Sequence, residues 1–545
     1  MMKRMGGVGQ NRRELLIVLV LLFGFMANAQ ISQNVQLLGN YQGHRDLNIN
    51  GTYYSGVWGY YDENGREYGI LGALNGTAIV DLNFLPDSLH EVAFVPGPPA
   101  SYSYREFKTY LHYLYIVSEG GEGAQIVDLS GLPNSVRFVG NFQFDGYTRT
   151  HSIGETDGYL YLNGGNATAN GGTAIVSVRN PEQPQKLGTF SGHYVHDSYA
   201  YGDRFYAAGI FGQGLSVVNV SDKQNPFLMK TIEYFGAGTH NVWTTDDGKY
   251  ALTTDEIGST PKTLKIWDVH DLEVVTKVGE WNPRPDETIH NVFVKGNYAY
   301  TAFYKAGLLV GDISDPANPT TAGFYDTYPV VNSTRFDGAW GAYPYLPSGR
   351  ILVSDMQTGL YVFQFDQQKI GKLVGTITDG ATGQPITGAI LRIKETGQTR
   401  WTGTAGQYLW GYATGTYSVT VEKEGYGTKQ MEALIGQNST TTVNIVLSKA
   451  TSVENGPPTA FALHQNYPNP FNPSTTIPFE LPRATHVTLT IHDLFGREVA
   501  RLVEGEVSGG RHSVPWSPGS SPSNVYYYSL KTSERTMTKR MILVK

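Results

Sequence analysis

The stretch "IHNVFVKGNYAYTAFYKAGLLVGD" at residues 289–312 places a histidine ten positions ahead of a tyrosine and then continues into an apolar run. A related stretch, "THNVWTTDDGKYALTTDE", begins fifty residues earlier and occupies residues 239–256. Repetition with a period of about 20–50 residues is typical of solenoids and propellers, in which each repeat buries its apolar faces against its neighbours. We therefore expect further copies in the chain.

Seven copies of this pattern follow one another along the chain. Their first residues, which we call the lead residues, are 44–50 positions apart. Each copy continues into another apolar strand, such as "GTAIVD" at 76–81, and usually into a Pro/Asn turn and a last strand. Four short strands per repeat are typical of a β-propeller blade. The lead residues are Trp58, Arg105, His151, His196, His240, His290 and Trp340.

The two ends of this repeat array complement each other. The seventh copy stops after "GLYVFQF" at 359–365 without an outer strand, and an unmatched segment, "VQLLGNYQ" at 35–42, precedes the first copy. Pairing of these two segments would close the ring and protect its edges. The sequence therefore predicts an all-β chain with a seven-bladed β-propeller over 31–367, in which strand 35–42 closes the last blade.

Composition and the first residues indicate the class of protein. The formal charge is only −7, and basic residues do not cluster beyond the first thirteen positions, which argues against a nucleic-acid partner. The absence of cysteine excludes disulfides, thiolate catalysis and cysteine metal sites. Basic residues, the apolar run "LLIVLVLLFGFMA" and Ala27-Asn28-Ala29 predict a secretory signal peptide over 1–29. A membrane anchor is disfavoured because the run is shorter than the roughly 20 residues of a spanning helix, and we expect no transmembrane segment in the mature chain.

The propeller segment resembles a known family. The "IVD" strands, "GTHNVW" at 238–243 and "GAWGAYPYLPSGRILVSD" at 338–355 are similar to LVIVD repeats and, over 35–366, to the propeller of choice-of-anchor B proteins. This resemblance implies a secreted or surface-anchored bacterial protein with no assigned catalysis.

A first small β-sandwich is expected at 371–448, where alternating strands are broken by glycine turns. Its beginning, "GKLVGTITDGATGQPITGAILRI", resembles a carboxypeptidase-regulatory-like domain. The resemblance implies a transthyretin-type sandwich that acts as a spacer, with carbohydrate contact as the alternative role. A flexible Ser/Gly/Pro-rich linker is expected at 449–458.

A second small β-sandwich is expected at 459–545. The segments "FALHQNYPNPFNPSTTIPFELP" at 461–482 and "TKRMILVK" at 538–545 strongly resemble a type A sorting domain of the type IX secretion system. The resemblance implies export by that machinery, removal of the domain by a sorting peptidase, and release or attachment at the surface. We therefore expect a secreted protein that is extracellular or lies on the outer cell surface.

The lead residues form a candidate ligand or channel ring, because the innermost strands of propeller blades surround a central channel. Imidazoles from four successive blades could hold a divalent metal as cofactor, with Asp197, Asp255 or Glu256 as oxygen ligands or partners of the ligands. The alternative is structural, with each histidine bonding the backbone of a neighbouring blade. The candidate metal ligands are His151, His196, His240, His290, Asp197 and Glu256.

The motif search assigns no catalytic residue, since the chain has no H-E-x-x-H, G-x-S-x-G or phosphate-binding loop motif. We expect a binding or interaction protein whose propeller presents its channel mouth or loops to an extracellular glycan or protein. The alternative is a metal-assisted hydrolase or lyase that acts on polysaccharide at the histidine ring. In that case two of Glu106, Asp197 and Glu256 would serve as the carboxylates. A structural role in the cell envelope is a third alternative.

Overall fold

The computed structural model describes residues 32–98, 104–258, 261–284, 286–330, 336–367, 370–394, 399–403, 405–449, 460–466, 469, 471, 474–494, 496–519, 521–522 and 524–543. Regular structure in these residues consists of β-strands, and no α-helix occurs among them, so the all-β expectation is confirmed. A helix long and apolar enough to cross a membrane is accordingly not found in the described residues. The expected signal peptide at 1–29 and nearly all of the linker at 449–458 lie outside them.

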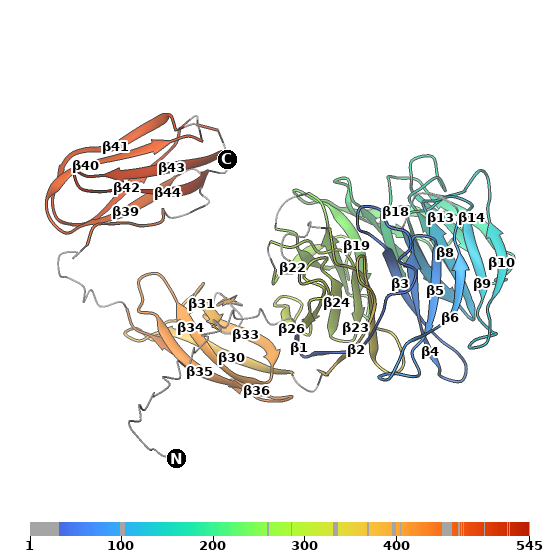
Figure 1. Ribbon diagram of the computed structural model, residues 1–545. Helices are drawn as coiled ribbons and strands as arrows, with labels where there is room; N and C mark the ends of the chain where they lie inside the picture. Colours follow the sequence, from blue (N-terminus) through green and yellow to red (C-terminus); the bar gives the residue numbers. More distant parts are fainter. Residues whose placement is uncertain are drawn as a thin grey trace, which may run out of the picture. The chain divides into compact units, whose positions relative to one another are not determined.

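Five successive parts of the chain each form a four-stranded sheet whose strands follow chain order (Figure 1). The first sheet contains β3 (Tyr54–Tyr61), β4 (Glu67–Ala73), β5 (Gly76–Asp81) and β6 (His90–Pro96). The second contains β7 (Arg105–Tyr110), β8 (Tyr113–Ser118), β9 (Ala124–Asp128) and β10 (Arg137–Phe142). The third contains β11 (Ser152–Thr156), β12 (Tyr159–Asn163), β13 (Thr173–Ser177) and β14 (Gln185–Phe190). The fourth contains β15 (Asp197–Tyr201), β16 (Arg204–Gly209), β17 (Gly214–Asn219) and β18 (Phe227–Ile232). The fifth contains β19 (Thr239–Thr244), β20 (Tyr250–Asp255), β21 (Leu264–Asp268) and β22 (Thr276–Trp281).

The next two sheets combine strands from distant parts of the chain. The sixth contains β23 (Val292–Lys295), β24 (Tyr298–Ala302), β25 (Leu308–Asp312), β26 (Thr320–Tyr325) and, at its edge, β1 (Ser32–Gln33). The seventh contains β27 (Ala339–Tyr343), β28 (Arg350–Asp355), β29 (Gly359–Phe365) and then β2 (Val35–Tyr41). β2 pairs antiparallel with β29, from Val35 opposite Phe365 to Tyr41 opposite Leu360. The beginning of the described chain therefore lies beside the end of the repeat array.

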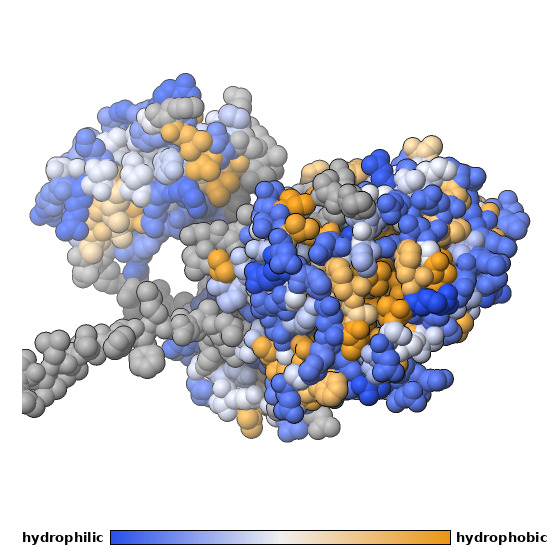
Figure 2. Space-filling model, turned by 45° about the vertical axis from the view of Figure 1, so that its right-hand side comes forward, coloured by the Kyte–Doolittle hydropathy of each residue, from blue (hydrophilic) through white to orange (hydrophobic). Residues whose placement is uncertain are grey.

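The first strands of these seven sheets contact one another in a closed series. β3, β7, β11, β15, β19, β23 and β27 are neighbours in that order, and β27 also contacts β3. Buried side chains fill the space between adjacent sheets: Leu71 and Ala78 of the first sheet share one cluster with Leu352 and Leu360 of the seventh. The core of this part is therefore divided among the sheet–sheet interfaces. Figure 2 shows a mainly hydrophilic surface with some hydrophobic side chains gathered on the face turned to the viewer.

A β-bulge recurs at the outer strand of all seven of these described sheets. The register shifts at Ile79/Val80 in the first sheet, and equivalent shifts occur in the next five sheets. The pairing of β2 with β29 contains the same shift, between Leu37 and Gly39. A bulge bends its strand and increases the local twist. β2 therefore has the same geometry as the outer strands that follow their own sheets directly.

Two further sheets are formed by residues 370–447. One has the order β33 (Gln407–Ala413), β30 (Ile370–Asp379), β36 (Thr440–Thr442), and β37 (Ile445–Leu447) also pairs with β30. The other has the order β32 (Thr399–Trp401), β31 (Ile390–Ile393), β34 (Gly415–Glu422), β35 (Lys429–Ile435). The buried residues of the two sheets include Leu373, Leu391 and Val421. They lie on one face of their strands, as expected because successive side chains of a strand point to opposite faces.

Residues 446–545 belong to a separate compact unit. Its first sheet has the order β38 (Ala462–Leu463), β39 (Thr475–Leu481), β42 (Gly510–Trp516). Its second has the order β41 (Glu498–Val507), β40 (Thr485–His492), β43 (Asn524–Lys531), β44 (Thr536–Leu543). Ile477, Leu489, Tyr528 and Met541 come from both sheets and share one hydrophobic cluster. The unit therefore has a core of its own.

The contribution of β2 can be tested by shortening one buried side chain. Val35 is 5% exposed and packs in the cluster shared by the sixth and seventh sheets, whereas Leu37 on the same strand is 37% exposed. We expect Val35→Ala to lower the stability of the β2–β29 pairing by about 1–2 kcal/mol. Hydrogen exchange of β29 amides, measured by mass spectrometry, should then accelerate by roughly tenfold. Leu37→Ala is the matched control, and an equal effect of both variants would contradict the prediction.

Candidate functional site

Each histidine among the lead residues stands at a β-bulge where a first strand begins. The N–H of His196 donates to the carbonyl oxygen of Ala208 at 2.8 Å, and the next residue, Asp197, pairs with the same Ala208. His240 is the residue left over where the register of β19 shifts, and Trp340 occupies the same position in β27. A bulge turns a side chain out of the regular alternation of its strand. The repeated bulge therefore aims these side chains in a common direction.

The four imidazoles form a continuous row, which we call the histidine row: His151, His196, His240 and His290. The distances between successive ring centroids are 4.1, 4.2 and 4.0 Å. Trp340 extends the row, with its ring 4.5 Å from that of His290. His196, His240 and His290 are buried. The structure therefore brings five of the seven lead residues together.

The two nitrogens of these rings have different environments. Nδ1 of His290 lies 2.5 Å from the carbonyl oxygen of Trp340, and Nδ1 of His196 lies 3.3 Å from that of His240. A carbonyl oxygen only accepts, so Nδ1 carries the proton in both rings and Nε2 keeps its lone pair. Nδ1 of His240 has no hydrogen-bond partner among the described residues. The row thus contains imidazoles in the tautomer that binds metals through Nε2.

Glu256 supplies an oxygen at the same place. Its Oε2 lies 3.7 Å from Nε2 of His240, and its Oε1 accepts a hydrogen bond of 2.6 Å from the hydroxyl of Tyr304. One ligand atom from each of His196, His240 and Glu256 lies within 4.8 Å of the other two. Two imidazoles and one carboxylate are a ligand set that catalytic zinc sites use. These three residues therefore form the candidate metal centre.

Electrostatics keep most of the row neutral. Burial lowers the pKa of His196 and of His240 well below the usual histidine value, and repulsion from the neighbouring imidazoles adds to the effect. Burial also lowers the pKa of His290, although Glu256 opposes the shift. A neutral imidazole is the form that coordinates a metal, since the ligating nitrogen must be deprotonated. The central part of the row is therefore prepared for coordination at neutral pH.

His151 behaves differently because it has an acidic partner. Its Nδ1 lies 2.9 Å from Oε1 of Glu119. Burial lowers the pKa of His151, but the hydrogen bond and charge of Glu119 outweigh it, so the net pKa is raised. The hydrogen bond to His151 in turn lowers the pKa of Glu119. His151 therefore ends the row as an ion-paired imidazole, not as a neutral ligand.

A second carboxyl group lies close to the row. Glu106 accepts a hydrogen bond of 2.8 Å from the indole nitrogen of Trp340. Burial raises the pKa of Glu106 to about 7, against the opposing effect of this hydrogen bond. The group can therefore hold or release a proton near neutral pH, which is the property of a general acid or base.

Two lead residues expected in the ring are not in it, and one expected ligand is engaged elsewhere. Trp58 donates to Oγ1 of Thr109 at 3.1 Å, and its ring contacts are Phe293 and Tyr343. Arg105 is fully buried, and its Nε donates to a backbone carbonyl of the first sheet at 3.0 Å. Oδ2 of Asp197 accepts a hydrogen bond of 2.6 Å from Asn241 on the next first strand. Asp197 thus joins neighbouring sheets.

Sequence reasoning missed Glu119 and Tyr304. Glu119 and Glu256 both stand directly after the second strand of their sheets, β8 and β20. Comparison of this position across the copies would have paired each acid with the histidine row. Tyr304 has no such signal, because its hydroxyl reaches Glu256 only through the contact between sheets.

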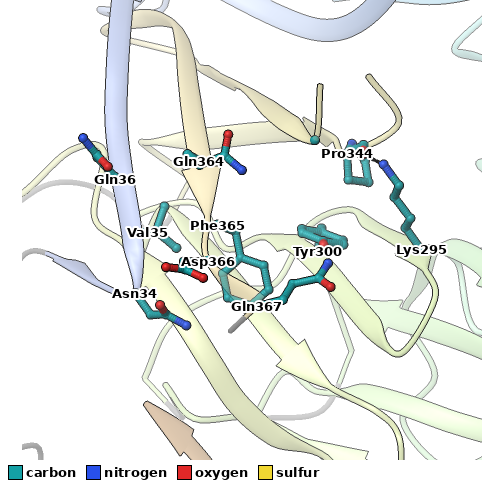
Figure 3. A pocket seen from close by; sticks show the side chains of 11 residues that line it. Asn34, Val35, Gln36, Lys295, Tyr300, Pro344, Gln364, Phe365, Asp366 and Gln367 are labelled. Carbon is teal, nitrogen blue, oxygen red and sulfur yellow. Dashed lines mark hydrogen bonds between the residues drawn. The ribbon is translucent and has the colours of Figure 1, made fainter. Parts of the chain in front are cut away.

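Another pocket, of about 610 Å³, lies where β2 and β29 meet the loops of the sixth and seventh sheets (Figure 3). Its one ammonium group, Nζ of Lys295, donates to the carbonyl oxygen of Pro344 at 2.8 Å. Nδ2 of Asn34 similarly donates to the carbonyl oxygen of Ala322 at 3.1 Å. These two donors are occupied by backbone, although Oδ1 of Asn34 has no hydrogen-bond partner among the described residues, and the lining brings together no imidazoles like those of the histidine row.

Comparison with known proteins gives two family matches. Residues 289–327 match the LVIVD repeat, and residues 372–448 match the carboxypeptidase regulatory-like domain. Both resemblances inferred from the sequence are thereby confirmed for these segments. A search of curated proteins gives no match. A chain in a solved structure titled "Crystal Structure of Mitotic Checkpoint Complex" is similar at 11% identity and a TM-score of 0.43, covering 67% of this chain and 99% of that chain. A likeness at this level carries no argument about function.

The two kinds of histidine can be distinguished by titration. In NMR spectra of the histidine-labelled full chain, we expect His196 and His240 to be still neutral when the pH is about one unit below the usual histidine pKa of roughly 6.5. His151 should still be protonated above that value. Glu119→Gln removes the charged partner and leaves only the smaller effects of Glu106 and Asp197 against burial, so the pKa of His151 should fall. Glu122→Gln, at a neighbouring exposed site, is the control. An unchanged His151 titration in Glu119→Gln would show that Glu119 does not set its charge.

Proposed function

We propose that this protein is an exported binding protein whose channel holds a divalent metal ion. In this proposal residues 31–367 form a seven-bladed β-propeller, followed by small β-sandwich modules at 371–448 and 459–545. The closed series of first-strand contacts and the bulge shared by all outer strands support the propeller. The resemblance to choice-of-anchor B proteins supports a role at the cell surface without assigned catalysis.

The single observation that carries the metal proposal is the convergence of His196, His240 and Glu256 within 4.8 Å. The ligand set of imidazole and carboxylate favours zinc or a similar divalent transition metal. The hydrogen bond between Nδ1 of His196 and a backbone carbonyl fixes the tautomer, and the hydroxyl of Tyr304 orients the Glu256 carboxylate. When bound, such a metal would act as a Lewis acid or as a fixed positive charge for an extracellular ligand.

A metal-assisted hydrolase or lyase acting on polysaccharide is the second candidate, and Glu106 is the observation that favours it. A carboxyl group with a pKa of about 7 beside the row could donate a proton to a leaving oxygen or accept one from an attacking water. The indole of Trp340 would orient this carboxyl group through its hydrogen bond. Asp197 lies near enough for its charge to raise the pKa of Glu106, but its Oδ2 is bonded to Asn241, so binding remains the preferred function.

We further propose export through the type IX secretion machinery, with the sorting peptidase as a second partner. The resemblance of residues 461–482 and 538–545 to a type A sorting domain supports this route. The hydrophobic cluster that joins β39, β40, β43 and β44 supports a module able to fold independently, as a removable signal requires. The mature protein would then be secreted or displayed on the outer cell surface.

The metal proposal predicts near-stoichiometric zinc in the untagged full chain after addition of zinc and removal of the excess, measured by elemental mass spectrometry. His240→Ala removes one ligand, and Glu256→Gln removes the anionic oxygen while keeping an acceptor for Tyr304. Loss of one ligand or its charge should weaken binding by at least tenfold. His112→Ala, an exposed histidine outside the row, is the control. Undiminished zinc in Glu256→Gln, or none in the wild type, would contradict the proposal.

The export proposal predicts that deletion of residues 459–545 traps the chain before it crosses the outer membrane. The deleted segment has its own core, so the sheets of residues 32–365 should still fold. Expression in a bacterium that carries a type IX secretion system, followed by cell fractionation, would measure this. Export of the truncated chain at the level of the full chain would refute the proposed role of the segment.

A further inference from the structure

A second site lies three residues farther along the same first strands. A pocket of about 520 Å³ is lined by aromatic rings and one ammonium group. We call it the aromatic basin and define it by Trp58, Lys108, Tyr199, Trp243, Tyr343 and Tyr345. Successive residues of a strand advance by about 3.3 Å, so the basin is on the order of 10 Å from the histidine row along the strands. A volume of this size is typical of small-molecule sites.

Two of the aromatic residues of the basin have their polar atoms bonded within the protein. The indole nitrogen of Trp58 donates to Thr109, and the hydroxyl of Tyr345 donates to the carbonyl oxygen of Val294 at 2.7 Å. Trp243 packs with its ring centroid 4.0 Å from that of Tyr199. Because these polar atoms are already bonded within the protein, the basin wall offers mainly π faces, which bind the C–H surfaces of a flat or ring-shaped ligand.

Lys108 is the one cation among the residues that line the basin, which also include Glu155 and Asp157. Its ammonium lies 3.9 Å from the centre of the Trp58 ring and donates to the carbonyl oxygen of Phe107 at 3.2 Å. No salt bridge to Lys108 is found among the described residues, although the charges of Asp197, Glu106 and Glu155 lie near enough to act on its pKa. Burial lowers the pKa of Lys108, as expected for a cation held in a poorly solvated place. Because none of these carboxylates contacts the half-buried ammonium directly, an anionic group of a ligand that does so would be stabilised there by a charge-assisted hydrogen bond.

Hydrogen-bonding capacity lies on the neighbouring first strand, β11, where Glu155 is close enough for its charge to interact with that of Lys108. Oε1 of Glu155 accepts from the N–H of Gly158 at 2.9 Å, and Oε2 has no hydrogen bond to a described residue. Burial raises the pKa of Glu155 to about 7, so its carboxyl group is partly neutral at physiological pH and repels an anion less. The basin therefore combines π faces, one cation and one free oxygen that can bond a hydroxyl group.

We propose that the aromatic basin binds an acidic sugar. The sugar ring stacks on the aromatic faces, its carboxylate pairs with Lys108, and a hydroxyl group donates to Oε2 of Glu155. A neutral sugar would leave Lys108 unpaired, and an aromatic acid would leave Glu155 without a donor. A cationic ligand is disfavoured because Lys108 already occupies the face of Trp58. This assignment goes beyond the metal proposal and does not depend on it.

The test uses the full chain in the presence of a chelator, so that any metal in the histidine row is absent. Glucuronate, glucose and benzoate are titrated separately, with quenching of tryptophan fluorescence and isothermal calorimetry as readouts. We expect glucuronate to bind at least about tenfold more tightly than either matched compound, since a charge-assisted hydrogen bond is worth about that factor. Glucose lacks the carboxylate and benzoate lacks the hydroxyl groups, so each control isolates one half of the recognition.

Variants assign the recognition to the basin. Lys108→Met keeps the side-chain length and should weaken glucuronate by about tenfold while leaving glucose unchanged. Lys249→Met, at an exposed lysine outside the basin, should change neither. Equal binding of glucuronate and glucose to the wild type overturns the role of Lys108, and equal binding of benzoate and glucuronate overturns the sugar. Binding that requires added zinc would move the ligand to the histidine row and would also overturn the assignment.

Discussion

The hydrogen bond from an imidazole Nδ1 to the backbone of the next lead residue is the interaction on which the candidate site depends. It joins the first strand of one sheet to the first strand of the next, as in the contact from His290 to Trp340. It also fixes the proton on Nδ1 and leaves Nε2 as the free acceptor. In His196 and His290 a structural role and a ligand role are therefore not alternatives, because Nδ1 serves the first and leaves Nε2 for the second. Nδ1 of His240 makes no such bond among the described residues, and Nδ1 of His151 bonds Glu119 instead.

The imidazoles of the row can pack at centroid distances of 4.0–4.2 Å because most of them are uncharged and do not repel one another. Protonation of one central ring would create a cation between two further imidazoles in a poorly solvated place. This cost explains the lowered pKa of His196 and of His240. The row accommodates positive charge only at its end, where Glu119 compensates His151. A metal at the centre would need its own anionic ligand for the same reason, and Glu256 is the carboxylate in the right position.

The repeat period predicted the strands well because four strands per copy bury the same apolar pattern seven times. The site was harder to predict, since the lead residues were aligned on the tyrosine ten positions later. In the fourth sheet that tyrosine, Tyr206, pairs with Tyr199, three residues after His196. In the first sheet Tyr68 pairs with Tyr60, only two residues after Trp58, and β3 contains its bulge between Tyr54 and Val57. Bulge positions depend on pairing between strands, which a single sequence does not reveal. The sequence alignment therefore groups Trp58 with the histidines, although it lies beyond the bulge of its strand.

The bulge of β3 also explains why the first sheet contributes no ring to the histidine row. Gly56 occupies this bulge, and a Cβ atom there would lie 2.2 Å from the carbonyl oxygen of Arg105. Gly56 therefore contributes no side chain to the row, and none of the rings in the row comes from the first sheet. The hydrogen bond between Trp340 of the seventh sheet and Glu106 of the second spans this sector instead. The titratable Glu106 thus lies on the second sheet beside Trp340, whereas the candidate ligands His196, His240 and Glu256 belong to the fourth and fifth sheets. The carboxyl group suited to proton transfer and the candidate metal ligands are therefore on different sheets.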